Sequence, residues 1–478
     1  MSPCFALLQF NKSISLYSFA SPPLYRPIYD MCERSYPKTA SWMEDKECCS
    51  WDGVECDETT GHVIGLDLGC SWLYGPIHSN SSLFFLRHLR RLNLAGNYFN
   101  YSLLPFEFGK FKSLTHLNLS YSVFSGQIPY EISQLSSLVS LDLSYNELLI
   151  ETPVWKRVVD NLTQLRELLL DRTNMSSIRP NSLMNLSSYL TTLSLNECGL
   201  QGKLEDNILC LPSLQTLNLG GNLQLEGLLP SSFLNMPMLS ELYLYDNQLV
   251  GPLPNSVSGL LNLTTLYLDS NFINGTLPSW LFSLPSLVRL SLNDNQLSGE
   301  IGEFKSNSLE YLDLSGYIPS SFGNLTNLEW LDLSSNKLTG EIPTQLVDLS
   351  WLEVLNLSQN QLTGHIPTGK QFNTFGNDSY TGNLGLCGYP LSRTCNNHEA
   401  KQPPLSTLQQ QDNLEPNNGF GWKAVSIGYG CGAIFGMLMG YIMFKIGKPK
   451  WLVRMVKLEQ HIMLRRLKNN AHRRGGRR

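Results

Sequence analysis

Residues 242–294 gather the side chains best suited to contact a partner. Aromatic and charged residues alternate there with leucine, and exposed tyrosine and arginine are enriched at binding hot spots. Their chemistry is non-covalent, because aromatic faces stack and carboxylates pair with cations. The predicted recognition surface consists of Tyr243, Tyr245, Asp246, Tyr267, Asp269, Arg289 and Asp294. The alternative, that these are ordinary solvated residues, stays open. A second, more charged group comprises Arg166, Glu167, Asp171 and Arg172.

Catalytic chemistry is not indicated. The eight histidines are scattered, and the chain has no HxxxH or GxSxG motif. The stretch "GYGCGAIFG" looks like a phosphate-binding loop, but it lies inside an apolar run and not between a strand and a helix. We therefore expect neither an enzyme nor a cofactor.

Cysteines cluster near both ends of the chain, in "ECCSWDGVEC" and "LCGYPLSRTC". Two chemistries fit the first cluster: zinc ligation with His62 as a fourth ligand, or disulfide bonds in an extracellular protein. The matching cluster at the other end favours disulfides, although the pairing stays open. The candidates are Cys48, Cys49, Cys56, Cys387 and Cys395. Cys198 occupies the position of a turn asparagine and is expected to be a small buried residue.

Between the cysteine clusters the sequence repeats the pattern LxxLxLxxNxLxGxIP, as in "LEWLDLSSNKLTGEIP". Most repeats are 24 or 25 residues long. The first leucines of the LxL pairs are Leu66, Leu92, Leu117, Leu141, Leu168, Leu193, Leu217, Leu242, Leu266, Leu290, Leu312, Leu331 and Leu355.

Each part of the repeat predicts a local structure. LxL places two leucines on the buried face of a short strand, and stacked strands form a parallel sheet. Gly and Pro favour an extended or 3₁₀ conformation over a full helix in the return leg, the segment that leads from the end of one strand back to the start of the next. The turn asparagine can satisfy backbone groups of neighbouring turns. Its positions are Asn97, Asn146, Asn247, Asn271, Asn295, Asn336 and Asn360.

The segment from Ala424 to Phe444 carries no charge and is long enough to cross a bilayer as a helix. Residues 445–478 contain twelve Lys and Arg but one acid, which predicts a cytoplasmic tail. Only 34 residues follow the span, too few for a kinase. Four glycines recur every four residues on one face of this helix, and close packing at such glycines predicts an interface with another membrane helix. They are Gly428, Gly432, Gly436 and Gly440.

N-x-S/T sequons are dense, which suits a surface exposed to the secretory pathway. We expect glycosylation at Asn80, Asn100, Asn161, Asn174, Asn185, Asn262, Asn274, Asn324 and Asn377. Asn11 is a further sequon. Asn118 and Asn356 also head sequons, but NLS is part of the repeat pattern itself, so their occupancy stays open.

The two caps of the repeat array read "SWMEDKECCSWDGVECDETTGHVIGLDL" and "GKQFNTFGNDSYTGNLGLCGYPL", and the repeat contains "LTGEIP". The sequence resembles the plant receptor-like proteins in these caps, its repeats, its span and its basic tail. These are kinase-less leucine-rich-repeat receptors related to the tomato leaf-mould resistance proteins. The resemblance implies an α/β leucine-rich-repeat solenoid of the plant-specific type, with a parallel sheet on its concave face, and one transmembrane helix. The expected parts are a cysteine-rich cap (1–62), repeats (63–372), a second cap (373–397), a juxtamembrane linker (398–423), the transmembrane helix (424–444) and the tail (445–478).

Three features depart from that family. The start, "MSPCFALLQFNKSISL", offers no evident signal peptide and resembles the first helix of a mature cap, which we interpret as truncation. The repeat from Leu312 to Leu331 is short, and no island loop precedes the last repeats, so the junction at Ser315 and Gly316 resembles a deletion. The segment before the span is only weakly acidic.

By this resemblance we expect a single-pass type I protein of the plasma membrane with its N-terminal part extracellular. It would bind an extracellular peptide or protein and signal through an adaptor receptor-like kinase, contacted by the transmembrane helix, and a co-receptor kinase. Plant defence is the expected role, and no nucleic acid is involved. The alternatives are a developmental peptide-hormone receptor and a non-signalling decoy or inhibitor.

Overall fold

The computed structural model describes residues 2–18, 32, 35–205, 211–233, 236–257, 259–298, 302–314, 318–334 and 338–395. All of them belong to the first of two compact units, residues 1–398. The predicted linker, transmembrane helix and tail all lie outside the described residues. Within the described part, no helix is long and apolar enough to cross a membrane.

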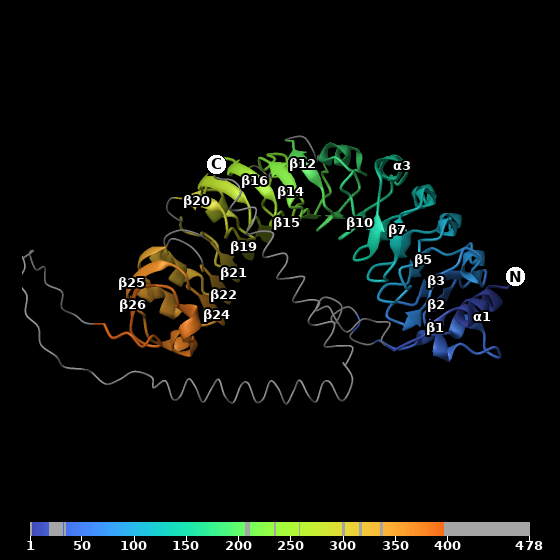
Figure 1. The fold of residues 1–478 in the computed structure, drawn as a ribbon, viewed down its shortest axis with the longest axis horizontal. Coiled ribbons are helices and arrows are strands. Elements are labelled where there is room, and N and C mark those ends of the chain that lie inside the picture. Colours follow the sequence, from blue (N-terminus) through green and yellow to red (C-terminus); the bar gives the residue numbers. More distant parts are fainter. Residues whose placement is uncertain are drawn as a thin grey trace, which may run out of the picture. The chain divides into compact units, whose positions relative to one another are not determined.

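The repeats stack their LxL strands into one sheet of 14 strands, as the pattern predicts. Figure 1 shows these strands lining the inner side of the curved first unit. Every marker leucine is paired in register with the next and is at most 3% exposed. After the antiparallel pair β2 (Val54–Cys56) and β3 (Val63–Asp67), the parallel strands are β5 (Arg91–Asn93), β6 (His116–Asn118), β8 (Ser140–Asp142), β10 (Glu167–Leu169), β11 (Thr192–Ser194), β13 (Thr216–Asn218), β15 (Glu241–Tyr243), β17 (Thr265–Tyr267), β19 (Arg289–Ser291), β21 (Tyr311–Asp313), β22 (Trp330–Asp332) and β24 (Val354–Asn356).

The turn asparagines bridge neighbouring repeats, which confirms the role predicted for them. Asn97 donates to the carbonyls of Leu68 at 2.8 Å and Leu94 at 2.9 Å, and its Oδ1 accepts from the backbone amides of Ser71 and Leu73. The same bonds recur at Asn146, Asn271, Asn295 and Asn360, and also at Asn222 and Asn383. Asn336 lies outside the described residues.

The return legs are extended strands followed by 3₁₀ helices, as the Gly-x-x-Pro pattern predicts. In β25, Gly364 has φ 85°, and a β-carbon there would lie 2.9 Å from the Glu341 side chain, so both conformation and space require glycine. The outer strands are β7 (Ser125–Gln127) with β9 (Glu147–Leu149); β12 (Gln201–Leu204), β14 (Gln224–Gly227), β16 (Gln248–Pro252), β18 (Phe272–Thr276) and β20 (Gln296–Ser298); and β23 (Thr339–Glu341), β25 (Gln361–His365) and β26 (Gly385–Cys387). The 3₁₀ helices are η1 (Lys38–Ser41), η2 (Cys48–Ser50), η3 (Ser82–Phe85), η4 (Phe106–Lys110), η5 (Tyr130–Gln134), η6 (Pro180–Asn185), η8 (Leu281–Ser283), η9 (Ser320–Asn324), η10 (Thr344–Asp348), η11 (Lys370–Thr374) and η12 (Asn377–Ser379).

One return leg is a full α-helix, α3 (Thr152–Asn161), which the repeat pattern did not predict. This repeat is longer than its neighbours, and its proline falls in the first helical turn, where a missing amide costs nothing. Trp155, Val158 and Val159 then form one apolar stripe and are buried. The indole of Trp155 donates to the hydroxyl of Ser182 at 2.8 Å in the next repeat.

The caps close the ends of the core with disulfides, and the zinc alternative is wrong. Cys48 is bonded to Cys4 and Cys49 to Cys56, so these sulfurs are not the free thiolates that zinc requires. His62 instead lies against His88, with ring centroids 3.9 Å apart. At the other end Cys387 is bonded to Cys395.

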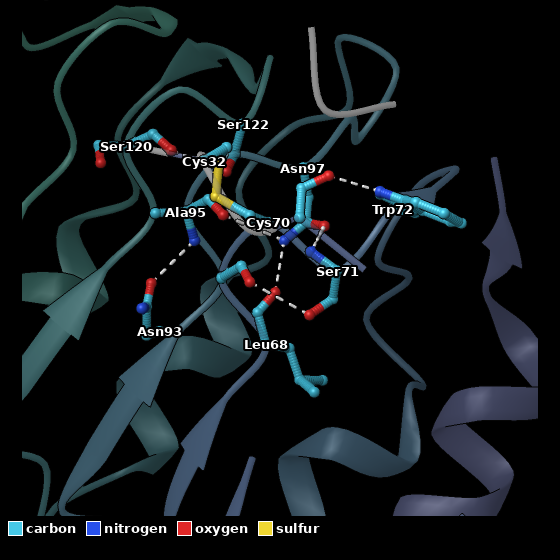
Figure 2. The surroundings of a disulfide bond; sticks show 12 residues. Cys32, Leu68, Cys70, Ser71, Trp72, Asn93, Ala95, Asn97, Ser120 and Ser122 are labelled. Carbon is cyan, nitrogen blue, oxygen red and sulfur yellow. Dashed lines mark hydrogen bonds between the residues drawn. A yellow bond between two sulfur atoms is a disulfide. The ribbon is translucent and has the colours of Figure 1, made fainter. Parts of the chain in front are cut away.

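Three of the paired cysteines were not among the predicted candidates. Cys4 lies in α1 (Pro3–Ser13), whose Ala6, Leu7 and Phe10 are buried, so the initial apolar run is indeed a cap helix. A further disulfide joins Cys32 to Cys70 beside the Asn97 hydrogen bonds (Figure 2). Close to it, the short strand β1 (Ser15–Leu16) pairs with β4 (Leu73–Tyr74).

The short repeat keeps its place in the main sheet. Leu312 in β21 and Leu331 in β22 are in register although only 19 positions separate them. Ser315, Gly316 and Tyr317 lie outside the described residues. In the described part of this repeat, no strand joins the outer sheets, which end at β20 and resume at β23.

Candidate ligand-binding face

Residues that flank the leucines of the main sheet form what we call the strand face. Strand geometry sends the leucines into the core and the flanking residues outward. Part of this face is hollowed over strands β13 to β21, with a volume of about 490 Å³. The hollow is lined by Asn218, Tyr243, Tyr245, Tyr267, Asp269, Ser291, Asn293, Tyr311 and Asp313.

A row of four aromatic rings crosses the strand face at this hollow. The Tyr243 ring meets the edge of Tyr267 at 5.4 Å between centroids, and Tyr267 lies 5.8 Å from Tyr311. Tyr311 stacks on Trp330 at 5.7 Å. The strand between Tyr267 and Tyr311 carries the small Ser291 in register with Tyr267, which leaves room for the two rings to meet. Trp330 is 39% exposed, so the row opens to solvent.

Tyr245 forms the opposite wall of the hollow and is held in place by the scaffold. Its hydroxyl accepts a 2.8 Å hydrogen bond from the side chain of Asn196. Its ring lies over Gly220, where a β-carbon would come within 2.7 Å of the ring. Burial raises the pKa of both Tyr243 and Tyr245 to about 12, so both phenols stay protonated and can donate hydrogen bonds.

Asp313 is the most unusual residue of the hollow. Its side chain is 5% exposed, and Oδ1 has no hydrogen-bond partner. Burial first, and then the charges of Asp332, Asp269 and Asp294, raise the pKa of Asp313 to about 8. Burial also raises the pKa of Asp269, against a hydrogen bond from Ser291 that lowers it. Asp332, by contrast, accepts bonds from the Ser334 amide and from Asn356.

Four of the seven predicted recognition residues come together in the hollow: Tyr243, Tyr245, Tyr267 and Asp269. The other three do not line it. Asp246 and Asp294 precede the turn asparagines with φ of 51° and 48°, a left-handed conformation that aspartate tolerates, so they are exposed turn residues. Arg289 is exposed at the start of β19, in register with Tyr311.

The sequence analysis missed Tyr311, Asp313 and Trp330. They occupy the same strand positions as the predicted residues, directly before or between the leucines of LxL. A search of those positions in every repeat would have found them, including the short repeat where the regular spacing fails.

In the second predicted cluster, Arg172 is paired and Asp171 is hydrogen-bonded within the chain. The Arg172 guanidinium lies 5.1 Å from the Tyr145 ring centroid and pairs with Glu197 at 3.0 Å. Tyr145 itself stacks on Tyr121 at 4.2 Å. Asp171 accepts from the Ser194 hydroxyl at 2.5 Å and from the Asn196 amide at 2.9 Å. Arg166 and Glu167 belong to the neighbouring segment and to β10.

All nine predicted glycosylation sites lie on exposed positions, compatible with glycans. Asn118 and Asn356 are half-buried on the strand face, and their amides are engaged by neighbouring polar groups. Cys198 is a buried, free thiol, and its burial was predicted from its turn position. The thiol donates to the Leu170 carbonyl, and burial raises the pKa of Cys198. Gly428, Gly432, Gly436 and Gly440 lie outside the described residues.

Comparison with known proteins agrees with this architecture. Leucine-rich-repeat family models match residues 87–148, 238–260, 261–316 and 319–362. Receptor-like protein 6 of Arabidopsis thaliana is 42% identical over 219 residues, 44% of this chain and 22% of the relative. Receptor-like protein Cf-9 of Solanum pimpinellifolium is 40% identical over 230 residues, 48% of this chain and 26% of the relative. The chain is therefore similar to plant receptor-like proteins over its leucine-rich repeats.

The aligned part of the chain spans about a quarter of the length of those relatives. Solved plant ectodomains share its fold. That of the receptor kinase GASSHO1/SCHENGEN3 from Arabidopsis thaliana, in complex with CASPARIAN STRIP INTEGRITY FACTOR 2, has a TM-score of 0.53 at 31% identity, covering 68% of this chain and 38% of its own. The peptide hormone receptor RGFR1 in complex with RGF2 has a TM-score of 0.52 at 29% identity, covering 67% and 58%.

Proposed function

We propose that this protein binds an extracellular peptide or protein on its strand face and is not itself an enzyme. The observation that carries the proposal is the exposed aromatic row from Tyr243 to Trp330 beside the buried carboxyl of Asp313. Aromatic rings held on rigid strands make contact area at low entropic cost. The likeness to ectodomains solved with bound partners supports a ligand of this kind.

We further propose that this protein signals through partner kinases. We propose a type I orientation in the plasma membrane. An adaptor receptor-like kinase would dock on the glycines of the predicted transmembrane helix, Gly428, Gly432, Gly436 and Gly440, and the ligand would recruit a co-receptor kinase. Replacing Gly432 and Gly436 with Leu should release the adaptor in co-precipitation from membranes at unchanged expression. Replacing Ile434 and Met439 with Leu is the matched control, and an adaptor retained by the glycine variant would contradict the docking.

Plant defence is the role we favour, because the sequence resembles the leaf-mould resistance proteins. The likeness to a peptide hormone receptor supports a developmental receptor as the second candidate. Expression of the full chain in leaf, followed by challenge with pathogen extracts, separates the two. A defence response that disappears in the chain carrying Tyr243→Ala, Tyr245→Ala and Tyr267→Ala supports the first. A growth phenotype on loss of the gene, with no response to any extract, supports the second.

A further inference from the structure

The hollow on the strand face has an excess of carboxyl groups. Asp269 and Asp313 line it, and Asp332 lies in the adjacent strand. In the described part of the chain, none of the ion pairs involves these three carboxyls. Arg289, the cation nearest in register, is exposed and forms none. The free scaffold therefore leaves these carboxyls without a paired cation.

The buried Oδ1 of Asp313 has no hydrogen-bond donor within the part of the chain that the structure describes. Leaving a buried acceptor without a partner is costly, and a nearby like charge adds to the cost. Burial and the neighbouring aspartates raise the pKa of Asp313 to about 8, which reflects the same missing partner. A positively charged hydrogen-bond donor entering the hollow would relieve both costs.

The aromatic walls suit a flat cation. Tyr267 and Tyr311 pack against each other beside Asp313, with ring centroids 5.8 Å apart. The open face of a tyrosine ring attracts a guanidinium group that lies within about 6 Å of the ring centroid. Guanidinium also has a planar set of donors that fits a carboxylate, and it is more weakly hydrated than an ammonium group. Both properties favour arginine over lysine.

The chain itself offers a precedent for this arrangement. Arg172 lies over the Tyr145 ring at 5.1 Å and pairs with Glu197 at 3.0 Å. Tyrosine and carboxylate there hold an arginine from the same chain. At Tyr267, Tyr311 and Asp313 the same chemistry is present, but in the described part of the chain no arginine lies over these rings: Arg289, in register with Tyr311, is exposed and acts on Tyr267 through its charge.

We propose that the hollow lined by Tyr267, Tyr311 and Asp313 receives an arginine side chain of the extracellular ligand. This inference rests on the proposed function and specifies the ligand: a peptide or protein segment that presents an exposed arginine. The carboxyls of Asp313 and Asp269 accept the guanidinium donors, and the guanidinium plane lies against an open face of the tyrosine pair.

The test uses the full-length glycosylated chain in nanodiscs and capped Gly/Ser pentapeptides whose central residue is Arg, citrulline or Glu. Citrulline keeps the shape and most donors of arginine but lacks its charge. Titration followed by ligand-observed NMR should show the Arg peptide binding at least tenfold more tightly than the citrulline peptide, with the Glu peptide weakest. Asp313→Asn should abolish the preference for Arg over citrulline.

The matched control is Asp142→Asn, at the same strand position in β8 but outside the hollow, which should keep the preference. Tyr311→Leu is a second variant that leaves all carboxyls in place, and it should weaken Arg binding at least threefold. Equal binding of Arg and citrulline peptides to the parent chain, or a preference unchanged in Asp313→Asn, overturns the inference.

Failure of this inference can be told apart from failure of the proposed function. If the leaf response to extract is lost in the triple tyrosine variant but is unaffected by Asp313→Asn, the receptor site stands and the arginine site does not. If both variants respond like the parent chain, the ligand does not use this face and both proposals fail.

Discussion

Tyr145 and Tyr311 both lie beside carboxyl groups on the same solenoid, yet of the two only Tyr145 has an arginine over its ring. Around Tyr145 the chain supplies Arg172, which covers the ring and pairs with Glu197. Around Tyr311 the rings are stacked, but Asp313 has a buried oxygen without a partner. The difference teaches that charged residues on a repeat surface are of two kinds: those that satisfy one another and those that leave room for a ligand.

The largest expected effect is a loss of ligand affinity when the tyrosines of the hollow are replaced, compared with replacement of the tyrosines near Arg172. Replacing Tyr243, Tyr245 and Tyr267 with Ala should weaken ligand binding by about 2 kcal/mol or more, because hot-spot aromatics carry most of an interface's energy. Affinity of the correctly folded, glycosylated chain for the active extract fraction is the measurement. Tyr121→Ala with Tyr145→Ala is the control near Arg172. Unchanged affinity in the triple variant would move the site elsewhere.

Asp313→Asn should raise stability at slightly alkaline pH. The folded-state pKa of Asp313, about 8, lies above the ordinary value near 4, so the folded chain holds a proton that the unfolded chain has lost. Stability from this group is therefore present below about pH 4 and is lost as the pH rises toward 8.

Asparagine does not titrate, so the Asp313→Asn variant does not lose this stability as the pH rises. We expect its free energy of unfolding at pH 8 to exceed that of the parent chain by on the order of 2 kcal/mol, and the difference to shrink as the pH is lowered. Thermal unfolding of the parent and variant chains between pH 4 and 8 measures it. Parallel curves for the two chains would show that Asp313 does not titrate in this range.

Asn293→Lys should supply the hollow with a cation from the chain itself. Asn293 lines the hollow with Asp269 and Asp313, so an ammonium group there can pair with either carboxyl. We expect about 1 kcal/mol of added stability and competition with any cationic ligand. Unfolding in urea and binding of the arginine pentapeptide check the two effects. Asn218→Lys, on the far side of the same hollow, tests whether the position of the added charge matters.

The smallest effect is expected from removing the internal cation. Arg172→Met keeps the aliphatic stem but loses the contacts with Tyr145 and Glu197, whose side chain is 47% exposed. Because exposed ion pairs contribute little, we expect a loss of about 0.5 kcal/mol in urea unfolding. Ligand binding should not change, and a drop in affinity would mean that both clusters contact the ligand.

The repeats, the buried leucines and the asparagine bridges could be predicted from the sequence because each depends on a pattern within one repeat. Features that depend on distant or irregular segments could not. Cys4 and Cys70 pair with cysteines 44 and 38 positions away, outside any short motif. Helix α3 arises because extra residues in one repeat carry an apolar stripe that overrides the usual return leg.

Part of the candidate site was predictable for the same reason. Tyr243, Tyr245, Tyr267 and Asp269 stand at regular strand positions, and the structure brings them together. Asp246 and Asp294 looked equivalent in composition, but their backbone conformation assigns them to the turn. The partnerless state of Asp313 depends on what is missing around it, which no spacing reveals.

The short repeat between Leu312 and Leu331 has a consequence for cooperativity. In a solenoid each repeat is stabilised by its two neighbours, so the array unfolds as a chain of nearest-neighbour couplings. In the described part of this repeat the neighbours are joined through the main sheet, without a strand in the outer sheets. The coupling there is weaker than at the repeats joined by two ladders. Amide hydrogen exchange should therefore report a separate, less protected folding unit from β22 onward, with the aromatic row of Tyr311 and Trp330 lying across its boundary.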